Sequence, residues 1–292
     1  MNGSENNYSI ELKDVTYYYD KGTPLQKLAL SGVSYGFEKG KVTGIMGHTG
    51  SGKSTLAMLL NGLTKCQSGK VFHNGRDIWE NKKDIGKLRF EVGLVFQYPE
   101  YQLFEETVEK DIGFGPRNMG KTEDEIKKRV CDAASFVGLS PSVMEKSPFD
   151  LSGGQKRRVA IAGVLAMEPD TLVLDEPAAG LDPSGREEIL SGLMRYNKEK
   201  GATVIIISHS MEDMARYCDN LLVLKDGKKM LSGTVSEVFS HAEELIGWGL
   251  NVPQITDLCE KLRKKGLSLS EGIFTVEKAA EDILALWGGN AK

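Results

Sequence analysis

A glycine-rich stretch, "GIMGHTGSGKST", is the strongest sign of chemistry in this sequence. It follows an apolar run, precedes a helical pattern and fits the spacing G-x-x-x-x-G-K-[ST] of a phosphate-binding loop. Glycines let backbone N–H groups surround the β- and γ-phosphates of a nucleotide, lysine adds a cation, and a hydroxyl can bind Mg²⁺. The ATP-binding residues predicted here are Gly47, His48, Thr49, Gly50, Ser51, Gly52, Lys53, Ser54 and Thr55, with Ser54 also a Mg²⁺ ligand.

Two adjacent carboxylates end another apolar run, "TLVLDEP". Asp175 is placed to hold Mg²⁺, and Glu176 is placed to polarise a water molecule that attacks the γ-phosphate. Paired carboxylates at a strand end are weak evidence alone. The phosphate-binding loop upstream makes them a strong prediction of a hydrolytic site.

Gln97 and His209 follow two further apolar runs, "EVGLVF" and "TVIIIS". Each alone is more often structural, but ligands of open α/β sheets bind at the carboxyl ends of strands. We therefore predict that Gln97 binds Mg²⁺ or orients water and that His209 contacts the γ-phosphate. In "VTYYYD", two tyrosines suit ordinary strand packing, and Tyr19 is predicted to stack on the adenine ring.

A second glycine turn, Ser152 to Gly154, opens the helical stretch "GGQKRRVAIAGVLAM". The free N–H groups and the positive dipole end of a helix N-terminus form an anion site. One chain therefore carries two phosphate-binding features. The basic run Lys156-Arg157-Arg158 that follows is interpreted as a solvated helix face.

The elements that position these residues are strand-like runs alternating with helical patterns. Runs that are apolar on both faces suit a buried, mostly parallel sheet. "IELKDVTYYY" and "GKVFHNGRDI" predict an antiparallel β layer, and Asn74-Gly75 and Asp226-Gly227 predict hairpins. We expect a helical insertion over about 98–158, with Thr122 as an N-cap, and a small, mostly helical segment from 236 to 292.

Composition excludes several classes of protein. The 292 residues have a net charge of −4, which argues against a general nucleic-acid surface. Four scattered cysteines form no metal or disulfide pattern and suggest a reducing compartment. The polar N-terminus does not resemble a signal peptide, and no run reaches the length of a membrane span.

Taken together, these motifs resemble those of ABC-type ATPases in kind and in order. The order along the chain is Tyr19, "GHTGSGKST", Gln97, "LSGGQ", "LVLDEP", "GLD" and His209. The resemblance implies a P-loop NTPase of α/β class with a RecA-like core, covering residues 1–235, and a C-terminal extension, residues 236–292. It also implies a head-to-tail dimer with a second ABC ATPase. In such a dimer, Ser152, Gly153, Gly154 and Gln155 complete the ATP site of the other subunit, and Asp182 belongs to a loop at the dimer seam.

The segment "FQYPEYQLFEETVEKDIGFGPRNMG" narrows the resemblance to ATP-binding subunits of energy-coupling factor (ECF) transporters, often called EcfA or CbiO. Within this segment, the residues "PEYQLFEET" favour the second of the two paralogous ATPases that many ECF transporters contain. The family imports vitamins and metal ions such as cobalt or nickel, so the resemblance implies Mg²⁺-dependent ATP hydrolysis at the cytoplasmic face of the cell membrane. The implied partners are a transmembrane coupling subunit and a membrane substrate-binding subunit, with no nucleic acid.

Two surfaces could serve those partners. Large apolar residues and acids in 98–107 could line a groove for a coupling helix, or they could pack beneath the helical insertion. In the extension, Ile255, Leu258 and Leu262 are expected on one helical face, as are Ile283 and Trp287, and we expect these faces to meet a partner's extension.

Three other classes remain possible. An amino-acid or lipoprotein ABC importer shares all seven motifs and lacks only the ECF-like segment and extension. A non-transport ABC protein usually needs a long insertion or a second cassette, and a plain P-loop kinase would leave "LSGGQ" and His209 unused. The sequence leaves open the transported substrate, the ECF subtype, the choice between ATP and other nucleotides, and whether the dimer is homotypic.

Overall fold

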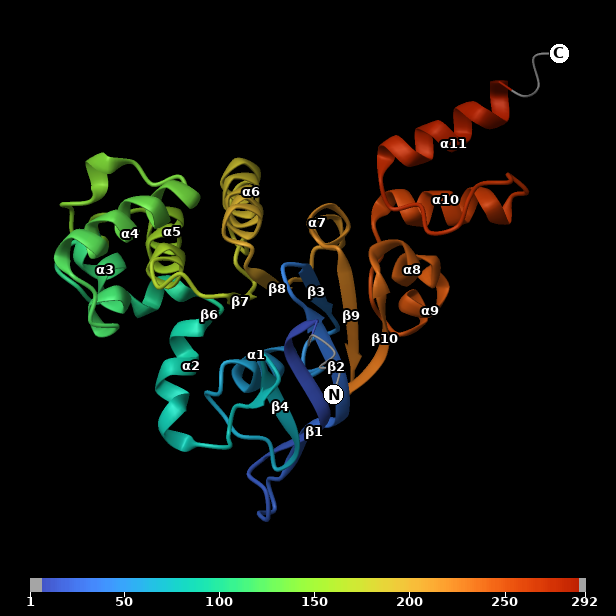
Figure 1. Cartoon of the computed structure of the whole chain (residues 1–292). Helices are drawn as coiled ribbons and strands as arrows, with labels where there is room; N and C mark the ends of the chain where they lie inside the picture. Colours follow the sequence, from blue (N-terminus) through green and yellow to red (C-terminus); the bar gives the residue numbers. More distant parts are fainter. Residues whose placement is uncertain (1–6, 289–292) are drawn as a thin grey trace, which may run out of the picture.

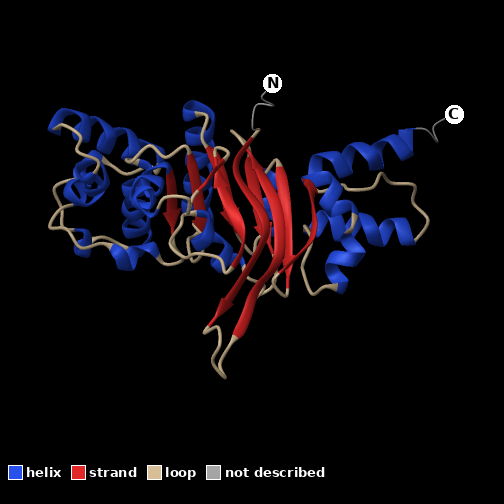
Figure 2. Ribbon diagram, turned by 60° about the horizontal axis from the view of Figure 1, so that its bottom comes forward, coloured by secondary structure: helices blue, strands red, loops and turns tan. Residues whose placement is uncertain are grey.

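The computed structural model describes residues 7–288, and the side chains of residues 7–286. Two sheets form the middle of the molecule, a group of helices lies at one end, and the C-terminal helices lie at the other (Figures 1 and 2). The expected α/β architecture with an added antiparallel layer is confirmed.

Six strands of the described chain form the central sheet, and their order differs from their order in the sequence. The order is β10 (Lys228–Thr234), β9 (Asn220–Lys225), β3 (Val42–Met46), β8 (Thr203–Ile207), β7 (Thr171–Asp175) and β6 (Val92–Val95). All pairs are parallel except β9 with β10. The four apolar runs predicted as parallel strands are therefore confirmed, and so is the hairpin at Asp226-Gly227.

The second sheet is antiparallel throughout the described residues. Its order is β2 (Lys27–Glu38), β1 (Tyr8–Tyr19), β4 (Ser68–His73) and β5 (Arg76–Asp77). The predicted pairing of "IELKDVTYYY" with "GKVFHNGRDI" is thus confirmed, as is the hairpin at Asn74-Gly75.

Alternate side chains of the buried strands point into two separate cores. Val173 of β7 joins a core shared with the antiparallel sheet and with helix α1 (Lys53–Leu60). Leu172 and Leu174 join the opposite core, which includes α6 (Pro183–Lys200) and α7 (Met211–Tyr217). This alternation has the period of two that a strand imposes, and burial on both faces explains the uninterrupted apolar runs.

The helical end of the molecule follows β6 and returns to the sheet before β7 (Figure 1). Thr122 caps its helix with a reciprocal hydrogen bond from Glu125, as its sequence position suggested. The elements here are η2 (Pro99–Gln102), α3 (Val108–Asn118), α4 (Glu123–Phe136), η3 (Pro141–Val143), η4 (Pro148–Asp150) and α5 (Gly153–Leu165). Two further helices, η1 (Lys82–Asp84) and α2 (Ile85–Glu91), come before β6.

The residues after β10 form two groups of helices. Val238, Phe239 and Leu245, from α8 (Val235–Ser240) and α9 (Ala242–Gly247), are buried in the main core. The last two helices, α10 (Gln254–Lys264) and α11 (Val276–Gly288), share a small apolar cluster of their own. No described helix is both long enough and apolar enough to cross a membrane.

Candidate active site

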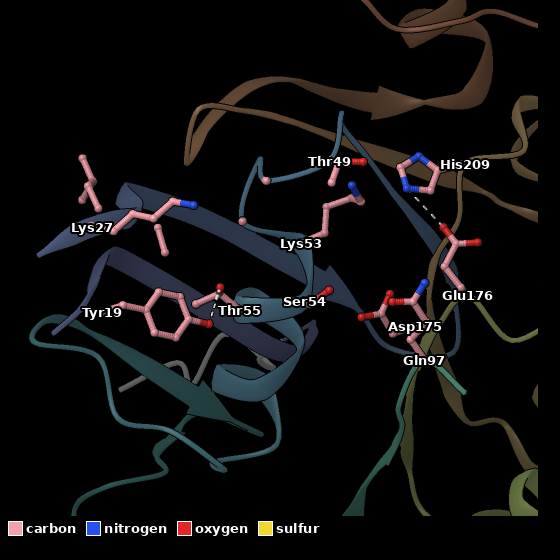
Figure 3. A pocket seen from close by; sticks show the side chains of 14 residues that line it. Tyr19, Lys27, Thr49, Lys53, Ser54, Thr55, Gln97, Asp175, Glu176 and His209 are labelled. Atoms are coloured by element: carbon pink, nitrogen blue, oxygen red, sulfur yellow. Dashed lines mark hydrogen bonds and ion pairs between the residues drawn. The ribbon is translucent and has the colours of Figure 1, made fainter. Parts of the chain in front are cut away.

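Most of the predicted site residues meet in one cleft of about 250 Å³ between the two sheets (Figure 3). The cleft receives side chains from the antiparallel sheet, from the start of α1 and from the carboxyl ends of β6, β7 and β8. Its lining is Tyr19, Lys27, Leu28, Ala29, Thr49, Gly50, Gly52, Lys53, Ser54, Thr55, Gln97, Asp175, Glu176 and His209.

The phosphate-binding loop begins where β3 ends and leads directly into α1. Lys53 is 7% exposed, and its Nζ donates hydrogen bonds to the carbonyl oxygens of Gly47 at 2.7 Å and His48 at 3.0 Å. Gly52 has a left-handed φ of +103°, and a Cβ there would lie 2.5 Å from the carbonyl oxygen of Ala29. Any other residue at this position would push the loop off β2, which accounts for the glycine before the lysine.

Tyr19 ends β1 at the wall of the cleft opposite the carboxylates (Figure 3). Its hydroxyl lies 2.9 Å from Oγ1 of Thr55, and its ring meets the edge of the Tyr17 ring at a centroid distance of 5.1 Å. These two contacts fix the orientation of a side chain that remains 36% exposed. A fixed, partly exposed aromatic ring suits base stacking.

Glu176 follows β7 and has a left-handed φ of +53°, which a non-glycine residue rarely adopts. Its amide donates to the carbonyl oxygen of Ile207 in β8. Burial, reinforced by the neighbouring charge of Asp175, raises the pKa of Glu176 to about 6, against the opposing effect of Lys53. A carboxylate with this pKa is ionised at neutral pH and remains basic enough to accept a proton.

His209 faces the same carboxylate, with Nε2 lying 3.6 Å from Oε1 of Glu176. That separation is too long for a hydrogen bond, and Oε1, which is buried, has no hydrogen-bond partner among the described residues. Burial and the charge of Lys53 lower the pKa of His209, so the ring is mostly neutral at neutral pH. His209 therefore lies against the carboxylate of Glu176 as a largely neutral ring.

Three oxygen-bearing side chains fit the predicted Mg²⁺ site. Ser54, Gln97 and Asp175 line one side of the cleft, and Figure 3 shows them facing a common space. Hydroxyl, amide and carboxylate oxygens are the hard ligands that Mg²⁺ prefers, with water completing its shell. The described chain contains no group of three or more His, Cys, Asp or Glu residues able to hold a metal, so a cation here would rely on this mixed set.

Some predicted nucleotide-binding residues lie outside the lining of the cleft. Gly47 and Ser51 shape the phosphate-binding loop from within, and Ser51 is fully buried. His48 turns aside, with Nδ1 2.8 Å from the carbonyl oxygen of Thr49 and Nε2 3.4 Å from Asp226. These three residues support the backbone of the loop and do not line the pocket.

The second glycine turn opens α5, which lies in the helical end of the molecule (Figure 1), and none of its residues lines the cleft. Ser152 is the N-cap of α5 and accepts from the amide of Gln155, while Oε1 of Gln155 accepts from the amide of Ser152. The first-turn amides of Gly153 and Gly154 have no partner within the helix. Asp182 similarly caps α6 by accepting from the amide of Gly185.

Sequence reasoning missed three lining residues and misjudged one basic run. Lys27 to Ala29 of β2 line the cleft because Lys27 pairs with Tyr19 across the antiparallel sheet, a signal available only once that register is known. The interpretation of the Lys156-Arg157-Arg158 run as a solvated face was wrong. Arg157 is 4% exposed and Arg158 is 14% exposed, since both side chains form internal ion pairs.

Comparisons with known proteins agree with this geometry. The model of the ABC transporter family matches residues 30–179, and a model of an AAA domain matches residues 145–214. The energy-coupling factor transporter ATP-binding protein EcfA2 of Caldanaerobacter subterraneus is 51% identical, over 94% of this chain and 96% of that protein. EcfA2 of Clostridium acetobutylicum is 52% identical over the same shares.

Solved structures of ABC transporter ATPases also resemble this chain. CbiO1 of Clostridium perfringens, described as part of the ABC transporter complex cbiONQ, is 43% identical with a TM-score of 0.74, covering 87% of this chain and 99% of that one. The bacterial ABC transporter cassette MJ0796, solved as a dimer, is 30% identical with a TM-score of 0.70, covering 77% of this chain and 98% of that one.

Proposed function

The chain belongs to the ABC transporter ATPases and, within them, to the ATP-binding subunits of energy-coupling factor transporters, and we propose that it drives an importer of vitamins or transition-metal ions. The expected P-loop ABC fold and the ECF resemblance are both confirmed by these relatives. The substrate class, the partner subunits and the position at the cytoplasmic face of the membrane are parts of the proposal.

The observation that carries the ATP-hydrolysing part of the proposal is the convergence of base, cation and oxygen ligands in one cleft, while the kind of importer rests on the EcfA2 relatives. Lys53 lies in the phosphate-binding loop, while Glu176 and His209 lie across from it at the ends of β7 and β8. Mg²⁺ held by Ser54, Gln97 and Asp175 would neutralise charge on the phosphate oxygens. The phosphates occupy the loop, and Tyr19 receives the adenine.

Hydrolysis in this arrangement depends on Glu176. Its carboxylate, with a pKa raised to about 6, orients a water molecule and accepts a proton from it as the water attacks the γ-phosphate. His209, whose Nε2 lies 3.6 Å from Oε1 of Glu176, donates a hydrogen bond toward the γ-phosphate oxygens. Lys53 stabilises charge on the leaving β-phosphate.

The signature turn requires a second ATPase subunit. Ser152 and the amides of Gly153 and Gly154 lie outside the chain's own cleft, which supports a role at the site of a neighbour. The dimeric form of MJ0796, a relative at 30% identity, supports this arrangement. A head-to-tail dimer would then hold each ATP between one phosphate-binding loop and the partner's signature turn, with the loop at Asp182 along the seam.

The membrane partner is proposed to dock beside Gln97. Tyr98, Tyr101 and Phe104 are 50%, 84% and 58% exposed, and the Phe104 ring meets the edge of Phe114 at a centroid distance of 4.8 Å. An exposed aromatic cluster on a loop suits the docking of a partner helix. Leu103, which is 7% exposed, instead packs beneath the helical end, as the alternative predicts.

The acidic rim of this cluster is smaller than the sequence suggested. Glu100 does not belong to it, because both of its carboxylate oxygens accept hydrogen bonds from Arg157. Glu105 and Glu106 remain, with Glu106 81% exposed and 2.6 Å from Lys110. Basic residues on the partner helix would face these two carboxylates.

The C-terminal extension is proposed to strengthen the dimer through α10 and α11. Ile255 and Leu262 pack into the small cluster between these helices, whereas Leu258, predicted on their face, is 47% exposed. Leu258 and Leu284, the latter 64% exposed, thus offer apolar surface to a partner. The side chain of Trp287 lies outside the described residues.

Removing residues 253–292 tests this role and keeps α8 and α9 of the main core, while it takes away Phe274, whose ring packs against Phe239 of α8. Thermal unfolding of the truncated protein is therefore measured alongside. Sedimentation should show weaker dimerisation of the nucleotide-free protein, while nucleotide binding persists. An unchanged sedimentation profile would contradict the proposal for the extension.

The proposed function is tested by extracting the native complex in mild detergent and identifying what co-purifies. We expect a paralogous ATPase, a transmembrane coupling protein and a small membrane protein that binds the substrate. Co-purification with the permease of an amino-acid or lipoprotein importer would contradict the ECF assignment while leaving the ATPase assignment intact.

A further inference from the structure

Arg157 is a buried cation in the signature helix that no step of hydrolysis uses. It follows Gln155 by two residues in α5, and its side chain is 4% exposed. Its Nε and Nη2 donate to the two carboxylate oxygens of Glu100 at 3.1 and 3.0 Å. Such a bidentate pair fixes both the distance and the orientation of its partners.

The same guanidinium reaches two other functional segments. Its Nη1 donates to the carbonyl oxygen of Ala179, three residues after the catalytic Glu176. Its central carbon also lies 5.9 Å from the centroid of the Tyr98 ring, the residue directly after Gln97. One side chain therefore ties the signature helix to the loop after Gln97 and to the loop after Glu176.

We call the contacts of Arg157 with Glu100, Ala179 and Tyr98 the junction. The neighbouring arginine has a different set of contacts, so the junction belongs to Arg157 alone of the two. Arg158 donates to Glu188 of α6 at 2.5 Å and to the carbonyl oxygen of Val137 at 2.8 Å. Those contacts join the helical end to α6 and do not reach the loop after Gln97. Arg158 is thus a matched control from the same helix, with hydrogen bonds to Val137 and Glu188 and none to the loops after Gln97 and Glu176.

We propose that Arg157 is a positioning residue that makes the loop after Gln97, the signature turn and the loop after Glu176 move as one unit. Tyr98 belongs both to this junction and to the exposed aromatic cluster, so a displacement of the cluster would shift the guanidinium and with it the signature turn. This role in transmission rests on the proposed function, in which a membrane partner docks on that cluster.

Loosening the junction should affect the rate of hydrolysis and ATP binding differently. ATP binds to the phosphate-binding loop and Tyr19, which Arg157 does not contact. The signature turn and Glu176 act on the γ-phosphate as it reacts. Loosening the junction should therefore lower kcat and leave KM for ATP nearly unchanged, which is the sign of an interaction that matters in the transition state.

Two substitutions loosen the junction without leaving an unpaired buried charge. Arg157→Lys keeps the charge but cannot form the bidentate pair and reach Ala179 as well. The double change Glu100→Gln with Arg157→Gln removes both charges together, because removing one alone would strand the other. Arg158→Lys is the control for a conservative change in the same helix.

The first experiment measures steady-state ATPase of each variant dimerised with its natural ATPase partner. We expect Arg157→Lys and the double variant to lose about tenfold in kcat with KM within about twofold. Arg158→Lys should keep both constants within about twofold. Thermal unfolding midpoints close to that of the unmodified protein would show that the fold is intact.

The second experiment measures the junction directly and needs no ATPase activity. Spin labels are placed on cysteines introduced at Tyr101 in η2, which is 84% exposed, and at Asp150, just before the signature turn. Cys131, an exposed native cysteine, is replaced by serine. The pulsed-resonance distance distribution should be narrow with Arg157 present and clearly broader in Arg157→Lys.

An unchanged distance distribution in Arg157→Lys would overturn the inference, whatever the chain's activity. So would equal loss of stability, nucleotide affinity and kcat in the Arg157 and Arg158 variants, since that pattern belongs to a structural role. If the native complex lacks ECF subunits while the label distribution broadens as expected, the proposed transport role fails and the junction stands.

Discussion

Replacing Glu176 with glutamine should stabilise the protein while it abolishes turnover. The substitution keeps the shape of the side chain and removes a charge that is buried beside Asp175 and has only 12% of its side chain exposed. The pKa of this carboxyl rises from 4.5 to about 6 on folding. The folded state therefore holds a proton on Glu176 more tightly than the unfolded state does, and ionisation above pH 6 costs stability.

The size of the effect follows from that shift. Ionising a carboxyl whose pKa moves from 4.5 to about 6 costs the folded protein about 2 kcal/mol at pH 8 and about 0.8 kcal/mol at pH 5. The cost falls further as the pH drops through 4.5 and vanishes well below that value, where the group is protonated in both states. Glu176→Gln should recover these amounts, so its stabilising effect should grow between pH 5 and pH 8.

The measurement is urea unfolding of the nucleotide-free protein at both pH values, followed by tryptophan fluorescence. Glu187→Gln is the control, and its effect on stability should have the opposite sign. Hydrogen bonds from Tyr217 and Arg216 lower the pKa of Glu187, so removing this carboxylate should destabilise the folded protein at pH 8. The ATPase of the unmodified protein should rise as pH increases through 6, while Glu176→Gln binds ATP and accumulates as an ATP-bound dimer.

Two results would refute this reasoning separately. A stability change that is equal at pH 5 and pH 8 would mean that the buried charge is not its cause. Near-normal turnover in Glu176→Gln, with partner ATPases excluded, would mean that Glu176 is not the base.

Three further predictions test other parts of the site. Mixing Lys53→Ala and Ser152→Arg chains in a homodimer should restore part of the ATPase through one intact interface, and confirmed mixed dimers without activity would argue against a signature acting on its neighbour. Tyr19→Ala should weaken ATP binding by about 1–3 kcal/mol in calorimetry, whereas Tyr19→Phe should bind within about twofold of the unmodified protein unless the hydroxyl bond to α1 matters more than stacking. Reversing charge at Glu105 and Glu106 to lysine should weaken assembly with the membrane partner and leave basal ATPase near normal, and intact transport in that variant would exclude this rim as the contact.

The sequence predicted the cleft well because its residues sit at the ends of strongly patterned strands. β3, β7 and β8 are buried along their whole length, so each reads as an apolar run whose next residue must lie at the sheet edge. Asp175 and His209 could be placed in this way without any knowledge of side-chain packing. The strand order brought them beside the phosphate-binding loop.

What could not be predicted depends on pairings between distant segments. The register of β1 with β2 brings Lys27 into the cleft opposite Tyr19, and local sequence carries no signal for it. The burial of Arg157 depends on Glu100, 57 residues away, so a basic run looked like a solvated face. Helical periodicity placed Leu258 with Ile255 and Leu262, but the next helix covers only part of that stripe.

The strongly buried strands also explain how the site tolerates its unfavourable features. Glu176 combines a left-handed backbone with a charge whose burial raises its pKa, and both features cost stability. The residue is fixed from both sides: it directly follows the fully buried β7, its amide bonds to Ile207 of β8, and the turn after it is tied at Ala179 to Arg157. Relaxing either side would let the carboxylate turn toward solvent, where its pKa would fall and its hold on the attacking water would weaken. If Glu176 is the base, as proposed, the rigidity of the sheet supports the chemistry, and a substitution that loosens the turn should lower both the pKa of Glu176 and the rate of hydrolysis.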